Sequence, residues 1–249
     1  MNNQEFSPRE TLERAFKRWW IIVLMTALGG MVGWAFHFLN PPLYEATASM
    51  TVNMDFSRRQ LTQYEEDYAF DAAGAIGTSD VVINQIIAEA KIQGLPVDIN
   101  QLQQQMFMER KQSVWELHIR NRDPHTAAEL ANIWAEKFYQ ALKVALGHAD
   151  RADQIQAQLD AIDISLTSGN IIINPDTQTM LKNILGELLQ EQQMSLGITS
   201  TMRFALSGSA IVPQKPAVYY LAELVLAGAC IGFIISLWLA GITRVQRHD

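Results

Sequence analysis

The stretch WWIIVLMTALGGMVGWAFHFL, residues 19–39, contains no Asp, Glu, Lys or Arg. At about 1.5 Å per residue, a helix of this length crosses the roughly 30 Å hydrocarbon core of a bilayer. A cleaved signal peptide is the rival interpretation, because basic residues precede the stretch. The stretch is too long for a signal, and residues 36–41 offer no small-x-small cleavage motif. We therefore predict a transmembrane helix over 19–39.

A second uncharged stretch, residues 224–243, lies near the other end of the chain, where a signal peptide has no place. The preceding Tyr219-Tyr220-Leu221 does not supply the polar spacer that comes before a lipid-anchor tail. We predict a second transmembrane helix over 217–243. One domain then occupies 40–216, between short tails at 1–18 and 244–249.

Basic residues near the two stretches lie mainly on their terminal sides. They are Arg9, Arg14, Lys17, Arg18, Arg244 and Arg247, against Lys215 on the inner side. Because positive charge is retained in the cytoplasm, we predict that both tails are cytoplasmic and that 40–216 lies outside. The net charge of −7 argues against nucleic acid as a partner. The one cysteine, Cys230, lies in the second stretch, so no disulfide supports the domain.

The first part of the domain shows mixed patterns. Two prolines end the first span, and the alternation that follows predicts an edge strand over 43–53. Residues 55–80 lack a sustained period and are assigned only to helix and loop. Ser79 is a candidate cap for a helix that ends near Gly94. Residues 102–108 are ambiguous, whereas residues 114–120 alternate as a half-buried strand does.

A long heptad pattern follows Asp123-Pro124, which supplies a helix cap and a proline in the first turn. It predicts a helix over about 124–167, mildly interrupted at Gly147, and a return helix over about 176–195. The apolar stripes of this hairpin either cover each other or also meet neighbouring subunits. The candidate face residues are Trp134, Phe138, Ile155, Leu159, Ile162 and Leu166. Residues 204–212 then predict a strand, followed by a proline-stiffened connection into the second span.

Small residues spaced by four allow helix backbones to approach closely in lipid. The first span has such a pair, and the second has a longer ridge. The candidate packing residues are Gly29, Gly33, Gly228, Gly232 and Ser236. They favour packing of the two spans, within one subunit or between subunits.

A search for catalytic chemistry finds little. The sequence has no G-x-x-x-x-G-K-[ST] loop for nucleotide phosphates, and no histidine pairs with another His or Cys at metal-ligand spacing. The acidic run Glu65-Glu66-Asp67 is typical of a solvated surface. His148, in the heptad seam, is read as a partly exposed helix position and not as a pH switch. We predict no catalytic, cofactor-binding or metal residues, and therefore no enzyme.

The order of motifs resembles the polysaccharide co-polymerases, or Wzz-type chain length determinants, in the form without a fused kinase domain. Four features carry the resemblance. They are Pro41-Pro42-x-Tyr44-x-Ala46, Ile119-Arg120-x-x-Asp123-Pro124-x-x-Ala127-Ala128-x-x-Ala131-Asn132, the long helix, and Val212-Pro213-x-x-Pro216. Structural roles at the two connections are expected for Pro41, Pro42, Tyr44, Pro213 and Pro216.

The resemblance implies an α+β membrane protein in which two transmembrane helices flank a membrane-proximal α/β domain with a long helical protrusion. It implies a homo-oligomeric, non-enzymatic scaffold that sets the chain length or export of a surface polysaccharide such as lipopolysaccharide, capsule or exopolysaccharide. A polymerase or exporter would be its partner, in the bacterial inner membrane, with the main domain periplasmic or extracellular. One alternative is an adaptor for a separate cytoplasmic tyrosine kinase. Another is a two-span sensor, although residues 244–249 leave no output domain.

Overall fold

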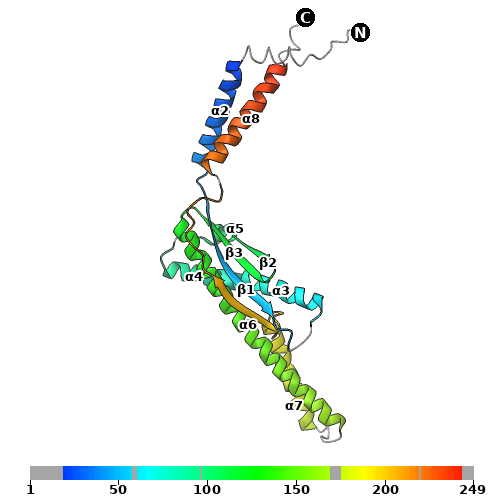
Figure 1. Cartoon of the computed structure of the whole chain (residues 1–249). Helices are drawn as coiled ribbons and strands as arrows, with labels where there is room; N and C mark the ends of the chain where they lie inside the picture. The colour runs from blue at the N-terminus through cyan, green and yellow to red at the C-terminus, as the bar shows by residue number, and fades with distance from the viewer. Residues whose placement is uncertain (1–18, 58–60, 96, 169–174, 219, 243–249) are drawn as a thin grey trace, which may run out of the picture. The chain divides into compact units, whose positions relative to one another are not determined.

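The computed structural model describes residues 19–57, 61–95, 97–168, 175–218 and 220–242 (Figure 1). The chain divides into two compact units, one made of Met1–Tyr44 with Gln214–Asp249 and the other of Glu45–Pro213. Two apolar helices near the ends of the chain thus flank an α/β domain that contains a long helix. The predicted fold class is confirmed. The predicted tails lie outside the described residues.

The first unit is a helical pair, α2 (Trp19–Leu39) and α8 (Leu221–Ile242), which pack against each other. Both helices are long and apolar enough to cross a membrane. Beyond α2, the backbone of Leu43 pairs with that of Val218, and the Ala217 N–H donates to the Leu43 carbonyl over 2.8 Å. The chain segments that leave α2 and approach α8 are therefore joined by hydrogen bonds.

The second unit contains a four-stranded sheet in the order β2-β3-β1-β4. The strands are β1 (Tyr44–Met54), β2 (Met106–Lys111), β3 (Val114–Asn121) and β4 (Met202–Gly208). The prediction of an edge strand over 43–53 was wrong, because β1 lies between β3 and β4. Its alternation does reflect one buried face, formed by Ala46, Ala48, Met50 and Val52. Alternation reports which face is covered and carries no information on which strands lie alongside.

The strand predicted over 204–212 begins earlier and ends earlier, at Met202 and Gly208. Its pairing with β1 shifts between Ser49 and Met50. Beyond the strand, the backbone of Ala210 pairs with the side chain of Asn132 in place of a strand partner. A helix side chain thus replaces the ladder hydrogen bonds there.

Three short helices connect β1 to β2. Helix α3 (Gln63–Gly77) has a capping box, in which Thr62 and Glu65 satisfy each other's backbone N–H groups. Helix α4 (Asp80–Ile92) is capped by Ser79, as predicted, and α5 (Ile99–Gln105) by Asp98. The ambiguous residues 102–108 divide between α5 and β2. A two-residue loop at Gln112 and Ser113 then joins β2 to β3.

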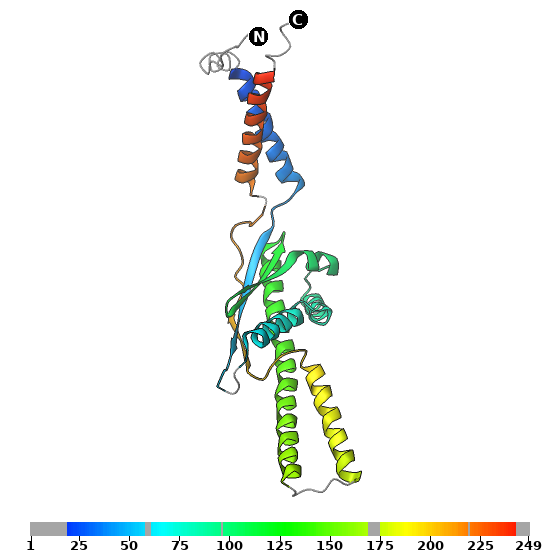
Figure 2. The same ribbon diagram turned by 90° about the vertical axis from the view of Figure 1, so that its right-hand side faces the viewer.

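The long helix α6 (Pro124–Thr167) continues through Gly147 without interruption and, at about 1.5 Å per residue, is roughly 66 Å long. Its first half packs against α3, α4, β3 and β4 and supplies much of the main hydrophobic core. Its second half packs mainly against α7 (Pro175–Met194), and Figure 2 shows this hairpin extending beyond the sheet. The expected turn at 169–174 lies outside the described residues.

Candidate functional site

The glycines of α2 and α8 lie where the two helix backbones touch. A Cβ on Gly29 would collide with the carbonyl oxygen of Gly228, and one on Gly228 would collide with that of Gly29. Gly33 and Gly232 meet backbone in the same way, against Leu224 and Met25. Glycine is required at these points because only a hydrogen atom fits between the backbones. In this structure the glycines of α2 therefore pack against those of α8 within one chain.

Ser236 is fully buried, and its hydroxyl donates to the Phe233 carbonyl over 2.6 Å, within its own helix. The hydroxyl therefore needs no partner from another helix. Five candidate residues lie in the two segments that contain the paired Leu43 and Val218, and all five are half-buried. They are Pro41, Pro42, Tyr44, Pro213 and Pro216.

Trp134 and Phe138 were expected on the hairpin or oligomer face, and this expectation was wrong. Both are fully buried in the main core. The indole N–H of Trp134 donates to the carbonyl of Gly77 over 2.9 Å, and the ring of Phe138 covers Gly77. The heptad pattern runs through both halves of α6, but the two halves have different packing partners. The first half packs against the sheet and α3, and the second half packs against α7.

Farther along α6, two of the candidate face residues, Ile155 and Leu159, pack against α7. Ile155 is buried with Leu188 of α7, and Leu159 and Ile184 pack at the edge of this contact. Ile162 and Leu166 are half-buried. The seam between α6 and α7 is therefore narrow. It leaves Leu185 and Leu189 of α7 49% and 58% exposed.

His148 bridges the base of this hairpin. Its Nδ1 lies 2.5 Å from a carboxylate oxygen of Glu191 in α7, and both side chains are largely buried. Arg151 lies 3.8 Å from the second oxygen of the same carboxylate. Sequence analysis identified His148 as a polar interruption of the seam but did not find its partner, because Glu191 is distant in the sequence. The pair links α6 to α7 at this end of the hairpin.

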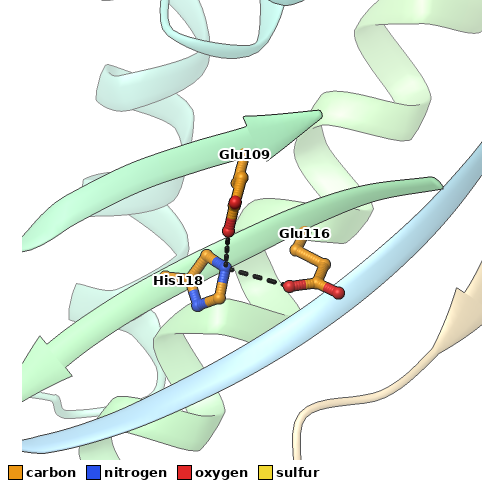
Figure 3. Close-up of side chains that lie close together, drawn as sticks. All are labelled: Glu109, Glu116 and His118. Atoms are coloured by element: carbon orange, nitrogen blue, oxygen red, sulfur yellow. Dashed lines mark ion pairs between the residues drawn. The ribbon is translucent and has the colours of Figure 1, made fainter. Parts of the chain in front are cut away.

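In the described part of the chain, one group of side chains converges as metal ligands do: Glu109, Glu116 and His118 on the β2–β3 hairpin (Figure 3). This group was not predicted from the sequence. Glu116 and His118 alternate on one face of β3, and Glu109 lies directly opposite Glu116 in the strand register. The i, i+2 spacing of Glu116 and His118 was visible in the sequence. Glu109 could be placed opposite Glu116 only once the pairing of β2 with β3 was known.

Comparison with known proteins agrees with the motifs. Residues 5–90 match the family model Wzz, described as chain length determinant protein. Within the described residues this region spans α2, β1, α3 and most of α4. No curated protein gives a match.

Two solved structures show a distant likeness. A full-length bacterial polysaccharide co-polymerase is 11% identical, with 95% of this chain and 98% of that chain covered and a TM-score of 0.39. A fragment of WzzB, a polysaccharide co-polymerase from Salmonella Typhimurium, is 12% identical, with coverage of 70% and 98% and a TM-score of 0.28. The sequence match shows that residues 5–90 of this chain are similar to the Wzz chain length determinant proteins.

Proposed function

We propose that this protein regulates the chain length of a bacterial surface polysaccharide. The observation that carries the proposal is the Wzz match over residues 5–90, which includes the first apolar helix and the first strand of the domain. The terminal helices and the long helix are consistent with it. In this proposal the protein acts on glycan length as a scaffold beside a polymerase or exporter, and does not itself catalyse a reaction.

The membrane arrangement in this proposal is that of an inner-membrane protein with both tails in the cytoplasm. The distribution of Lys and Arg around the apolar helices supports it, since these charges concentrate at the terminal sides. The domain between the helices would then face the periplasm or the cell exterior, where the glycan is extended.

Assembly with further copies of the chain is the second element of the proposal. Leu185 and Leu189 lie one helical turn apart on α7 and remain about half exposed in a single chain. Ile164 on α6 is also mainly exposed. The contact between α6 and α7 leaves these apolar side chains exposed. In the proposal they are buried against a neighbouring copy of the chain. This supports a scaffold that works as a homo-oligomer.

The decisive experiment is deletion of the gene followed by complementation. We expect deletion to change the modal length of a surface glycan on a gel, and the wild-type gene to restore it. An unaltered glycan ladder would refute the proposed function. A kinase that loses activity in the deletion strain while the ladder stays unchanged would favour an adaptor role instead.

The oligomeric element has its own test. We expect Leu185→Glu with Leu189→Glu to lower the particle mass measured in detergent and to alter the glycan ladder. Gln190→Glu with Gln193→Glu, which adds the same charge at two exposed positions of α7, is the matched control and should leave both unchanged. A monomeric wild-type protein would exclude the scaffold.

A further inference from the structure

The β2–β3 hairpin buries a histidine nitrogen that has no hydrogen-bond partner. The His118 side chain is only 9% exposed, and its Nε2 is completely covered yet forms no hydrogen bond. Two carboxylate oxygens face this nitrogen, Glu116 Oε2 at 3.3 Å and Glu109 Oε2 at 3.9 Å (Figure 3). Buried polar atoms without partners are rare in folded proteins. This nitrogen therefore marks a position where something should bind.

The other ring nitrogen determines which tautomer is present. Nδ1 of His118 lies 3.0 Å from Glu45 Oε1 and 2.9 Å from the hydroxyl of Thr47. An ionised carboxylate only accepts hydrogen bonds, so Nδ1 carries the hydrogen. Arg120 holds the second oxygen of Glu45 at 2.8 Å, which keeps this carboxylate in place. In the neutral ring, Nε2 then presents a lone pair toward two further carboxylates.

This arrangement is the one that proteins use to orient metal-binding histidines. A carboxylate that accepts from one ring nitrogen fixes the tautomer and leaves the other nitrogen free to coordinate a metal. The plane of the His118 ring is also set, because Phe107 is stacked on it at 4.5 Å between centroids and 2° between planes. Lone pairs from a nitrogen and two carboxylates repel one another unless a proton on Nε2 or a metal cation lies between them.

Lys111 also faces the group. Its Nζ lies 2.7 Å from Glu116 Oε2 and 3.5 Å from Glu109 Oε2. Its hydrogen bond to Glu116 raises the pKa of the Lys111 ammonium and lowers the pKa of the Glu116 carboxyl. Lys111 thus balances the carboxylate charge but leaves Nε2 without a hydrogen-bond partner. Its side chain is 52% exposed, so it can turn outward without disturbing the core.

We propose that His118 Nε2, Glu109 and Glu116 bind a divalent cation of the Zn²⁺ class, with Lys111 displaced from the carboxylates. One nitrogen with two carboxylates suits Zn²⁺ or Co²⁺ better than Mg²⁺ or Ca²⁺, which prefer oxygen ligands alone. The three ligand atoms already lie within 4.8 Å of one another. Ligand distances of about 2.0–2.2 Å require the longest separations to shorten. The half-exposed Glu109 side chain can make this adjustment, and water completes the coordination.

The cation would connect β2 to β3 at the outer end of the sheet. Among the described strands, β2 lies at an edge, held by its pairing with β3. A metal shared between Glu109 on β2 and Glu116 and His118 on β3 would add a second link across this pair. The bound metal should therefore raise the stability of the hairpin as well as occupy the orphan nitrogen.

The test uses the full-length, tag-free protein in detergent after treatment with a chelator. We expect saturable binding of about one Co²⁺ per chain with the visible absorption of a tetrahedral site, displaceable by Zn²⁺, and a higher thermal midpoint with Zn²⁺. Glu109→Gln changes an exposed side chain and should weaken binding about tenfold or more without loss of fold. His125→Gln, at an exposed histidine, is the control and should bind normally.

Lys111→Ala separates the proposal from a simple ion-pair network. If Lys111 competes with the metal, its removal should tighten Co²⁺ binding several-fold. If the carboxylates serve only Lys111, the variant will lose stability and gain no metal affinity, which would overturn the proposal. Absence of saturable Co²⁺ binding to the wild type, or binding unchanged in both Glu109→Gln and His118→Gln, would also overturn it.

Discussion

The side-chain amide of Asn132 in α6 pairs with both backbone groups of Ala210. The Ala210 N–H donates to Asn132 Oδ1 over 2.7 Å, and Asn132 Nδ2 donates to the Ala210 carbonyl over 3.2 Å. Ala210 is 9% exposed, so water does not readily replace these bonds. One side chain thus fixes the segment that leaves β4 to the long helix.

We predict that Asn132→Ala destabilises the protein by about 1–3 kcal/mol, because both backbone groups of Ala210 lose their partner in a buried setting. The measurement is chemical unfolding of the full chain in detergent. Asn84→Ala, at an exposed position of α4, is the control and should change stability by less than about 0.5 kcal/mol. Equal effects of the two substitutions would show that the Ala210 pairing is not important.

Two neighbouring glycines allow a matched test of the helical pair. A Cβ on Gly29 would collide with the backbone of Gly228, whereas one on Gly30 would make ordinary contacts of 3.8 Å and 3.9 Å with Val225 and Ala229. We predict that Gly29→Ala separates the helices and costs about 1–3 kcal/mol, as overpacking does. Gly30→Ala should be nearly neutral.

Thermal unfolding in detergent, together with the glycan ladder of complemented cells, checks this prediction. A loss of stability confined to Gly29→Ala would establish the close approach of the two backbones. If Gly30→Ala were as harmful as Gly29→Ala, the helices would have to contact each other through a different face.

What sequence reasoning could find depended on the range of the interaction. Small residues four apart in each span predicted the packing ridge, because the signal lies within one helix. The capping box of Thr62 and Glu65 was equally local, but α3 was assigned only weakly. Three of its five buried residues are small, Ala69, Ala73 and Gly77, and they give a faint hydrophobic period.

Longer-range relationships were not accessible in the same way. The orphan nitrogen of His118 depends on Glu109 across a hairpin and on Glu45 in another strand. Neither partner follows from spacing along the chain. The heptads of α6 likewise reported an apolar stripe correctly but did not reveal that Trp134 and Phe138 lie in the domain core. Periodicity identifies a buried face, and only the fold determines what covers it.

The His148–Glu191 pair should couple α6 to α7 measurably. We predict an interaction energy of about 1–3 kcal/mol in a double-mutant cycle of His148→Ala and Glu191→Ala, because a hydrogen bond to a charged group in a largely buried setting is stronger than an exposed one. The weaker contact between Arg151 and Glu191 is lost equally with and without His148, so it cancels from the interaction energy.

A second cycle at Gln156 and Asp160 provides the control. These two side chains are exposed and hydrogen-bonded over 2.8 Å within α6. Such a pair should couple by no more than about 0.5 kcal/mol. A His148–Glu191 coupling as small as that of the control would mean that the apolar seam alone aligns the hairpin.

The cap of α6 should make the stability of the protein depend on pH in the acid range. Asp123 accepts from the hydroxyl of Thr126 over 2.6 Å and from its backbone N–H over 2.7 Å. These bonds, the hydroxyl bond foremost, lower the pKa of the Asp123 carboxyl. The unfolded chain therefore binds a proton more readily than the folded one at this position. The stabilisation is complete above the unfolded pKa of about 4 and is lost as the pH falls through the lower folded pKa.

Asp123→Asn isolates this effect, because asparagine also caps helices but does not titrate. We predict that the wild type loses more thermal stability than the variant between neutral pH and about pH 3, since the other carboxylates titrate equally in both. The measurement is the thermal midpoint of the two proteins in detergent across that range. A difference between them that stays constant with pH would show that the Asp123 charge contributes nothing to the cap, and that its hydrogen bonds to Thr126 act in the same way whether the side chain is ionised or neutral.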